Sequence, residues 1–281
     1  MYQTYFGFNQ APFSLTPNTE LFQGLVPHYE AIQTVLSAIE MGEGVIKVSG
    51  EVGTGKTMVC RMLINQLVDE VSLVYLPNPQ LTGEELKIAI AKELEVEIRD
   101  SESLVDDIQA QLLKLHLKGK RVVALIDEAQ GLSDEALETI RLFGNLETEH
   151  AKLMQIVLLG QPELDARLEH HHLRQLKQRI SFSATLRPLS MEEAFAYIDH
   201  RVQVSGGNVN LFEAKVKKAI WKASKGVPRL INQVCHKSLL LACNSNATHI
   251  HMEHAYDAIN DTLDTVKPRF KTPFMWGWGL L

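Results

Sequence analysis

The segment Gly50–Thr57 constrains the fold of this chain more than any other feature, because it stands between a predicted strand and a predicted helix. Its pattern, Gly-x-x-x-x-Gly-Lys-Thr, is typical of a loop that wraps phosphate groups in that strand-loop-helix context. Glycines let successive backbone N–H groups face inward, and the following helix adds the positive end of its dipole. The sequence therefore predicts an α/β domain with a phosphate site at this loop.

Two side chains of the loop carry the predicted chemistry. Lys56 is expected to reach the β- and γ-phosphates of ATP, and the Thr57 hydroxyl is expected to hold Mg²⁺. ATP and Mg²⁺ are therefore the predicted cofactors. The residues expected to bind the nucleotide are Gly50, Glu51, Val52, Gly53, Thr54, Gly55, Lys56, Thr57 and Met58.

An acidic pair, Asp127-Glu128, follows the apolar run Val122–Ile126. Mg²⁺ prefers oxygen ligands, and hydrolysis of ATP needs a base that orients the attacking water. In open α/β folds, ligands bind at the carboxyl ends of the strands. We therefore expect Asp127 to coordinate Mg²⁺ through water and Glu128 to polarise the nucleophilic water.

The rest of the region from Val45 to Leu189 alternates short β-branched runs with longer amphipathic stretches, which is the pattern of βαβ units in a parallel sheet. The apolar runs at residues 122–126 and 156–159 predict central strands, buried on both faces. Five strands are predicted: Val45–Ser49, Ser72–Leu76, Arg121–Asp127, Leu153–Gly160 and Ile180–Leu186. Four helices are predicted between them: Lys56–Val68, Thr82–Leu94, Ser101–Leu117 and Ser133–Glu147, with Ser101 and Ser133 as N-caps.

The strand signal disappears after Pro188. Residues 190–265 have the pattern of four helices, separated by short breaks that contain glycine, proline or asparagine. Ser190 is expected to cap the first of them, with Glu192 and Glu193 in its first turn. The chain is therefore expected to end in a small all-helical domain.

Composition limits the partners. A formal net charge of −6 argues against sequence-independent binding of nucleic acid, because such binding normally needs clustered Lys and Arg. The N-terminus lacks the pattern of a secretory signal, so a cytoplasmic location is expected. The apolar run Pro273–Leu281 follows basic residues but is far shorter than the about 20 residues needed to cross a bilayer. Peripheral contact with the inner membrane, a frayed end and docking on a partner remain alternatives for this tail.

The motif Asp127-Glu-Ala-Gln130 is similar to the motif of DEAD-type helicases. A helicase, however, needs a second large α/β motor domain, and only helices are predicted after Leu189. From about Gly7 to Thr265 the chain instead resembles an AAA+ ATPase. That resemblance implies a P-loop AAA+ α/β fold, with a five-stranded parallel sheet flanked by helices and a small C-terminal all-helical lid.

The AAA+ resemblance also implies roles for four further residues. Gln161, after the fourth strand, falls at the position that senses the γ-phosphate, although the family more often has a shorter side chain there, and it is alternatively a helix-start residue. Arg179, or Arg174 in its place, corresponds to the arginine finger that reaches a neighbouring subunit, and a plain surface arginine is the alternative. Arg229, in Gly226-Val-Pro-Arg, matches the lid arginine that folds over the nucleotide, or else forms a salt bridge of the lid helix.

A closer resemblance, to the ExeA/GspA branch of AAA+ proteins, is carried by further motifs in combination with Gly50–Thr57 and Asp127–Gln130. The further motifs are Phe6–Pro17, His28–Ile32, Leu159–Leu164 and Gln178–Ile180. The resemblance implies four segments: a linker and helix at 1–43 that contributes to the adenine pocket, the AAA+ α/β domain at 44–189, the lid at 190–265 and a basic and apolar tail at 266–281. Core packing is the alternative account of Phe6, Phe8 and Phe13.

Members of this branch serve general secretion and pilus assembly. The resemblance therefore implies a homo-oligomeric ATPase that acts with pilus or secretion assembly proteins at the cytoplasmic face of the inner membrane. Two alternatives stay open: an AAA+ regulator of a DNA complex, like transposition or initiator ATPases, and a nucleotide-gated scaffold with little turnover.

Overall fold

A computed structural model describes residues 2–16, 18–22, 24–67, 71–77, 79–98 and 103–268 of the chain. These residues form two compact units. The sheet unit comprises the described residues of Val26–Val52 and Lys56–Leu186. The helical unit comprises those of Met1–Leu25, Gly53–Gly55 and Arg187–Leu281.

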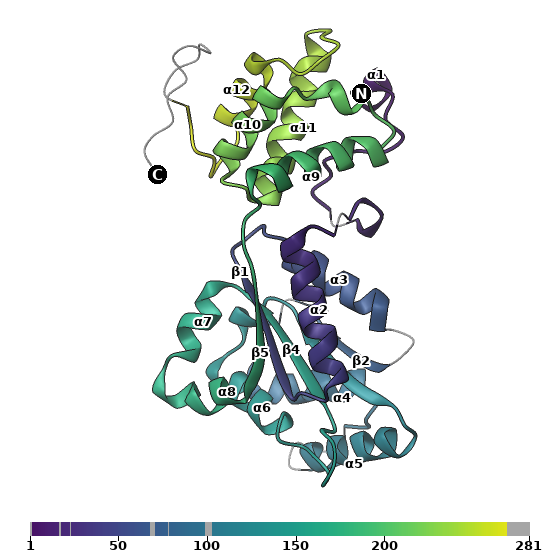
Figure 1. The fold of residues 1–281 in the computed structure, drawn as a ribbon. Helices are drawn as coiled ribbons and strands as arrows, with labels where there is room; N and C mark the ends of the chain where they lie inside the picture. Colours follow the sequence, from purple (N-terminus) through teal and green to yellow (C-terminus); the bar gives the residue numbers. More distant parts are fainter. Residues whose placement is uncertain are drawn as a thin grey trace. The chain divides into compact units, whose positions relative to one another are not determined.

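The sheet unit is built on five parallel strands, as the sequence predicts (Figure 1). The spatial order is β2-β3-β4-β1-β5, so the two most apolar runs, in β3 and β4, form interior strands and that prediction is confirmed. Every residue of β4 is buried. The strands are β1 (Val45–Gly50), β2 (Val71–Leu76), β3 (Arg121–Ile126), β4 (Gln155–Gly160) and β5 (Ile180–Leu186).

Strand register brings three loops together at one edge of the sheet. Ile126 of β3 pairs with Leu158 of β4, and Gly160 of β4 pairs with Ser49 of β1. All three strands are parallel, so their carboxyl ends lie side by side. The phosphate loop, the acidic pair after β3 and the residue after β4 therefore leave the sheet as neighbours.

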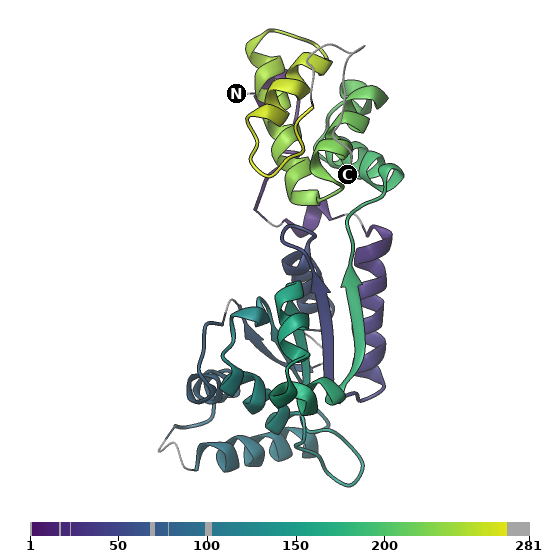
Figure 2. The ribbon, with the colours of Figure 1, turned by 90° about the vertical axis from the view of Figure 1, so that its left-hand side faces the viewer.

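Helices cover both faces of the sheet. On one face α2 packs against α3 and β5, and on the other α4, α5 and α6 pack together (Figure 2). Right-handed crossovers between parallel strands produce this division, because the chain runs outward from β1 to β2 and then returns. The helices of this unit are α2 (Val26–Glu40), α3 (Lys56–Leu67), α4 (Gly83–Glu93), α5 (Leu104–Leu117), α6 (Asp134–Phe143), α7 (Pro162–Leu168) and α8 (Arg174–Arg179), with the 3-10 turns η2 (Ala129–Gly131) and η3 (His171–Leu173).

Several predicted boundaries shift. The helix predicted to run to Glu147 ends at Phe143, because the next residue is Gly144 and Glu147 joins a bridge to Lys152. The strand predicted to end at Asp127 ends at Ile126, since the chain turns there. The predicted N-cap Ser101 and the predicted helix end Val68 lie outside the described residues, whereas Ser133 caps α6 by accepting from the backbone N of Ala136 at 3.1 Å.

The helical unit contains the four helices predicted for residues 190–265. Ser190 forms a capping box at the start of α9, in which its hydroxyl accepts from the backbone N of Glu193 at 3.2 Å and the Glu193 carboxylate accepts from the backbone N of Ser190 at 2.7 Å. The helices are α1 (Tyr2–Phe6), α9 (Met191–Val204), α10 (Ala214–Ser224), α11 (Pro228–Asn244) and α12 (Met252–Asn260), with the 3-10 turns η1 (Thr19–Leu21) and η4 (Val209–Leu211).

The segment predicted as one unit at 1–43 is divided between the two compact units at Leu25. Phe8 and Phe13 are buried in the core of the helical unit, where the ring centroids of Phe13 and Phe212 lie 5.7 Å apart. The buried Arg201 holds this segment by donating from Nε to the carbonyl of Pro12 at 2.5 Å. Core packing therefore accounts for Phe8 and Phe13, and a contribution of residues 1–43 to an adenine pocket stays a prediction.

The predicted tail Pro273–Leu281 lies outside the described residues. Its three alternatives, membrane contact, docking on a partner and a frayed end, therefore stay predictions. Among the residues that the structure describes, none of the helices combines the length and the apolar character that a bilayer span requires.

Candidate functional site

The loop between β1 and α3 has the backbone conformation that its glycines permit. Gly53 and Gly55 have φ angles of +82° and +107°. These lie in the region that residues with a Cβ rarely adopt, so both positions require glycine. The loop therefore turns sharply enough to place Lys56 as the first residue of α3.

Lys56 is folded back over its own loop. Its side chain is buried, and Nζ donates to the carbonyl oxygens of Gly50 at 2.7 Å and Glu51 at 3.1 Å. Burial lowers the pKa of Lys56 below its ordinary value, and the carboxylates of Glu128 and Asp127 act in the opposite direction. The strand register thus brings a lysine and two carboxylates within mutual electrostatic range.

Asp127 is a buried carboxylate, only 3% exposed. Its Oδ1 accepts from the backbone N of Glu128 at 3.0 Å, and its carboxylate also hydrogen-bonds the Thr57 hydroxyl. Burial raises the pKa of Asp127, while the hydrogen bond from Thr57 lowers it. The two residues predicted to hold Mg²⁺ from different elements are therefore in contact with each other.

Glu128 stands at the turn after β3 with φ 56° and ψ 39°, a left-handed conformation. For a residue other than glycine this costs about 1–3 kcal/mol, and such conformations cluster at functional sites. Its Oε2 accepts from the amide nitrogens of Gln130 at 2.6 Å and Gln161 at 2.9 Å. The carboxylate is thus held by two neutral donors rather than by a cation.

Gln161 occupies the N-cap position of α7 but makes no side-chain cap hydrogen bond. Its amide reaches across to Glu128, so the position is a helix start and also part of the acidic site. Gln130 was missed by the sequence analysis as a site residue. The available signal was its place two residues after Glu128, in the same turn after β3.

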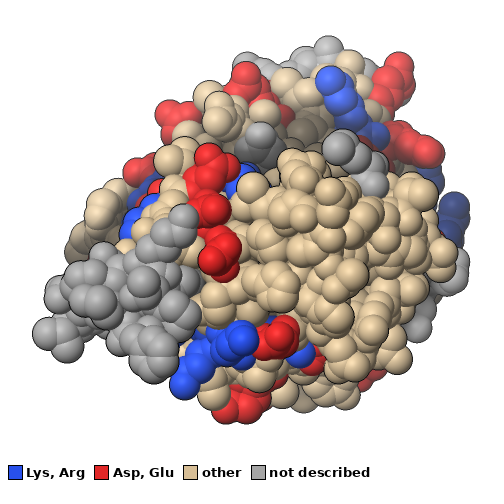
Figure 3. Space-filling view, turned by 90° about the horizontal axis from the view of Figure 1, so that it is seen from above, with Lys and Arg blue, Asp and Glu red and all other residues tan. Residues whose placement is uncertain are grey.

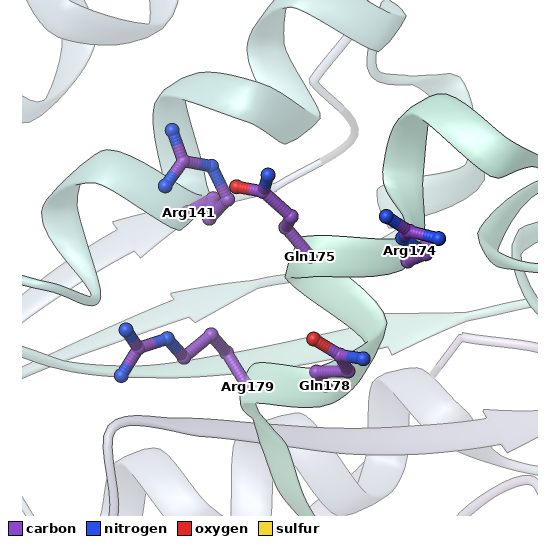
Figure 4. Close-up of a pocket in the computed structure, with 5 residues that line it drawn as sticks. All are labelled: Arg141, Arg174, Gln175, Gln178 and Arg179. Carbon is purple, nitrogen blue, oxygen red and sulfur yellow. The ribbon is translucent and has the colours of Figure 1, made fainter.

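The two candidate finger arginines, Arg174 and Arg179, lie on α8 and are exposed. With Gln175, Gln178 and Arg141 of α6 they line an open cavity of 320 Å³, and Figure 4 shows the three arginine side chains at separate positions around it. Arg141 also pairs with Glu138 at 2.6 Å. Sequence reasoning missed Arg141, which comes from a different helix and carries no motif of its own.

Arg229, the predicted lid arginine, is the second residue of α11 in the helical unit, and its side chain is exposed. Pro228 occupies the first helical position, where its fixed φ angle suits a helix start. The predicted contact between the Arg229 side chain and a bound nucleotide stays a prediction.

Comparison with known proteins agrees with this architecture. Residues 39–168 match the AAA_22 family, described as an AAA domain. General secretion pathway protein A of Aeromonas hydrophila is 41% identical over 245 residues, which make up 86% of this chain and 45% of that protein. The chain therefore spans less than half the length of this relative.

Solved structures resemble the chain in fold. Cdc6p from Pyrobaculum aerophilum has a TM-score of 0.71 and 18% identity, covering 90% of this chain and 71% of that one. The ORC1 protein of Aeropyrum pernix, solved in complex with DNA, has a TM-score of 0.68 and 17% identity, covering 90% and 69%. At such identities the likeness concerns the fold alone.

The parallel sheet in the order β2-β3-β4-β1-β5, the glycine loop before α3 and the AAA domain match together define the class. The chain has the AAA+ P-loop fold and an AAA domain, as AAA+ ATPases have, and this fold implies nucleotide binding. Within this class, the 41% identity to General secretion pathway protein A supports the ExeA/GspA family.

Proposed function

We propose that the chain binds ATP with Mg²⁺ at the loop Gly50–Met58 and hydrolyses it through Asp127 and Glu128. The observation that carries this proposal is the convergence of Lys56, Asp127 and Glu128 at one edge of the sheet. Three separate elements supply these side chains: α3, the end of β3 and the turn that follows.

The donor set suits magnesium. The Thr57 hydroxyl and the Asp127 carboxylate are hard oxygen donors, and Mg²⁺ at nucleotide sites takes one or two protein ligands together with phosphate and water. When bound, the ion supplies positive charge against the phosphates. Lys56 adds a second positive charge, while the N–H groups of the loop orient the phosphates.

Glu128 is the proposed general base. The hydrogen bonds from Gln130 and Gln161 reach Oε2 from neutral amides, so they orient the carboxylate without forming an ion pair with it. Such a group accepts a proton from an attacking water. Gln161 is proposed to contact the same water or the γ-phosphate from the end of β4.

A second copy of the chain is proposed to complete the site. Arg174 and Arg179 are exposed on α8, so both guanidinium groups are open to a neighbouring subunit, and one of them is proposed to contact the nucleotide that this subunit holds. An arginine supplied in trans stabilises charge in the transition state only after assembly. Arg229 is proposed to respond to the nucleotide from the helical unit.

In the cell we propose a role in assembling a general secretion apparatus or a type IV pilus at the cytoplasmic face of the inner membrane, with peripheral contact through the tail. Support comes from the 41% identity to General secretion pathway protein A. We propose for this chain the particular role of MshM, the ATPase of the mannose-sensitive haemagglutinin (MSHA) pilus.

Regulation of a DNA complex is not favoured. The ORC1 protein solved in complex with DNA shares 17% identity with this chain, which carries the fold and no more. The face of the molecule in Figure 3 is largely uncharged, and its described Lys and Arg lie among Asp and Glu rather than in a stripe. Binding to the phosphate backbone of DNA needs clustered positive charges on the protein surface.

The hydrolytic assignment is tested by Glu128→Gln, which keeps the shape and both amide contacts. We expect ATP turnover to fall by about 100-fold or more while ATP affinity stays within about two-fold, because a base contributes to the transition state rather than to binding. Turnover is measured by phosphate release and affinity by a fluorescent ATP analogue. Undiminished turnover in this variant would overturn the proposal, and negligible turnover in the assembled wild type would favour the scaffold alternative.

A further inference from the structure

Gln130 lies at the centre of the hydrogen bonds around Glu128. Its amide nitrogen donates to Glu128 Oε2 at 2.6 Å, and its amide oxygen accepts from the backbone N of Gln161 at 3.0 Å. One side chain thereby connects the turn after β3 to the start of α7. A carboxamide is suited to this because it presents a donor and an acceptor on one rigid plane.

The backbone at Gln130 is held in turn by Arg167 of α7. Arg167 Nη1 donates to the carbonyl oxygens of Gln130 at 2.9 Å and Leu132 at 2.7 Å. The same guanidinium forms an ion pair with Asp134 at the start of α6. The turn that carries Glu128 and Gln130 is therefore hydrogen-bonded to α7 and its N-cap residue through side chains and also through backbone carbonyls.

This arrangement matters because the backbone of Glu128 does not belong to a strand or a helix. Its left-handed conformation ends β3, so regular structure does not fix the direction of its side chain. The two amides that meet at Oε2 fix it instead. Loss of either amide leaves a single donor on Oε2 and so weakens the constraint that directs the carboxylate towards a water.

We propose that Gln130 is a positioning residue for Glu128 and that Arg167 makes this position depend on α7. Helix α7 packs against both η2, which contains Gln130, and α8, which carries Arg174 and Arg179. A subunit that docks on α8 thereby acts on the base of the same chain through α7. The inference rests on the proposed function, since the placement of Glu128 affects turnover only if Glu128 is the base.

The first test replaces Gln130 by methionine, which has a similar length but neither the donor nor the acceptor. We expect kcat to fall about ten-fold, with KM for ATP and affinity for a non-hydrolysable ATP analogue within about two-fold of wild type. Gln130→Asn keeps the amide but shortens its reach, and should show the same split if Gln130→Met does not fold. Gln66→Met, on the exposed side of α3, is the matched control and should change neither quantity.

A double-mutant cycle separates positioning from general stability. In a Glu128→Gln background, Gln130→Met should cause little further loss of single-turnover rate, because Gln130 acts through the Glu128 carboxylate. An equal fold-loss in both backgrounds, or an unchanged kcat for both Gln130 variants, would overturn the inference. Undiminished turnover of Glu128→Gln alone would instead overturn the proposed function.

Arg167→Lys tests the connection to α7. Lysine keeps the positive charge near Asp134 but lacks the planar fork that serves two carbonyls. We expect a fall in kcat of several-fold, and no further fall when the change is added to Gln130→Met. Independent, multiplicative losses would remove Arg167 from the inference while leaving Gln130 in place.

Discussion

Shortening Gln161 by one methylene group is the most direct probe of the acidic site. In Gln161→Asn the amide keeps its chemistry but loses about 1.5 Å of reach, the length of one C–C bond. The observed bond to Glu128 Oε2 is 2.9 Å, so the shortened amide stands at roughly 4.4 Å, beyond hydrogen-bonding distance. The substitution thus removes one of the two donors on the base.

A hydrogen bond to a charged group contributes about 1.5–3 kcal/mol, and about 1.4 kcal/mol corresponds to a ten-fold change in rate. Gln130 continues to hold the same oxygen, so the lower end applies and we expect kcat to fall roughly ten-fold. KM for ATP should stay near the wild-type value. Steady-state phosphate release across a range of ATP concentrations separates the two parameters.

Gln66→Asn makes the same chemical change on the exposed side of α3 and should leave kcat unaltered. An unchanged kcat in Gln161→Asn would refute the reasoning, because it would mean that the Gln161 bond to Glu128 is absent when water attacks. A rise in KM with constant kcat would assign Gln161 to nucleotide binding instead.

Two further outcomes are expected. Glu128→Gln protein can be mixed in equal amounts with a double variant that carries Arg174→Ala and Arg179→Ala. Turnover should then recover to about one quarter of the wild-type value, because one in four randomly formed interfaces combines an intact base with an intact arginine. If turnover does not recover at concentrations at which the wild type assembles, a trans arginine is excluded. Acidification should destabilise the helical unit, because burial lowers the pKa of His200, His236 and His254 below 6.5. The stability that these neutral histidines contribute is fully present above their unfolded-state pKa of 6.5. It is lost as the pH falls through their lower folded-state pKa values. His236, which hydrogen-bonds the Tyr2 hydroxyl at 3.0 Å, can be replaced by glutamine, and a melting temperature that then varies with pH as steeply as in wild type would contradict this account.

The local and periodic features of this protein could all be read from residue type and spacing. The glycine loop, the five strands, the four helices after Pro188 and the cap at Ser190 follow from residue type and spacing, since backbone conformation and apolar periodicity are properties of short segments. The acidic pair could be placed at the sheet edge because a buried parallel strand has a defined carboxyl end.

The tertiary structure decided which distant side chains meet. Register between β3 and β4 brought Gln161 onto the same oxygen of Glu128 that the neighbouring Gln130 contacts, and Gln161 lies 33 positions from Glu128 in the chain. Packing placed the N-terminal Phe8 and Phe13 in the helical unit, and it set Arg141 of α6 beside the arginines of α8. No periodicity encodes such contacts, because each depends on the free energy of packing whole elements together rather than on the preferences of a single segment.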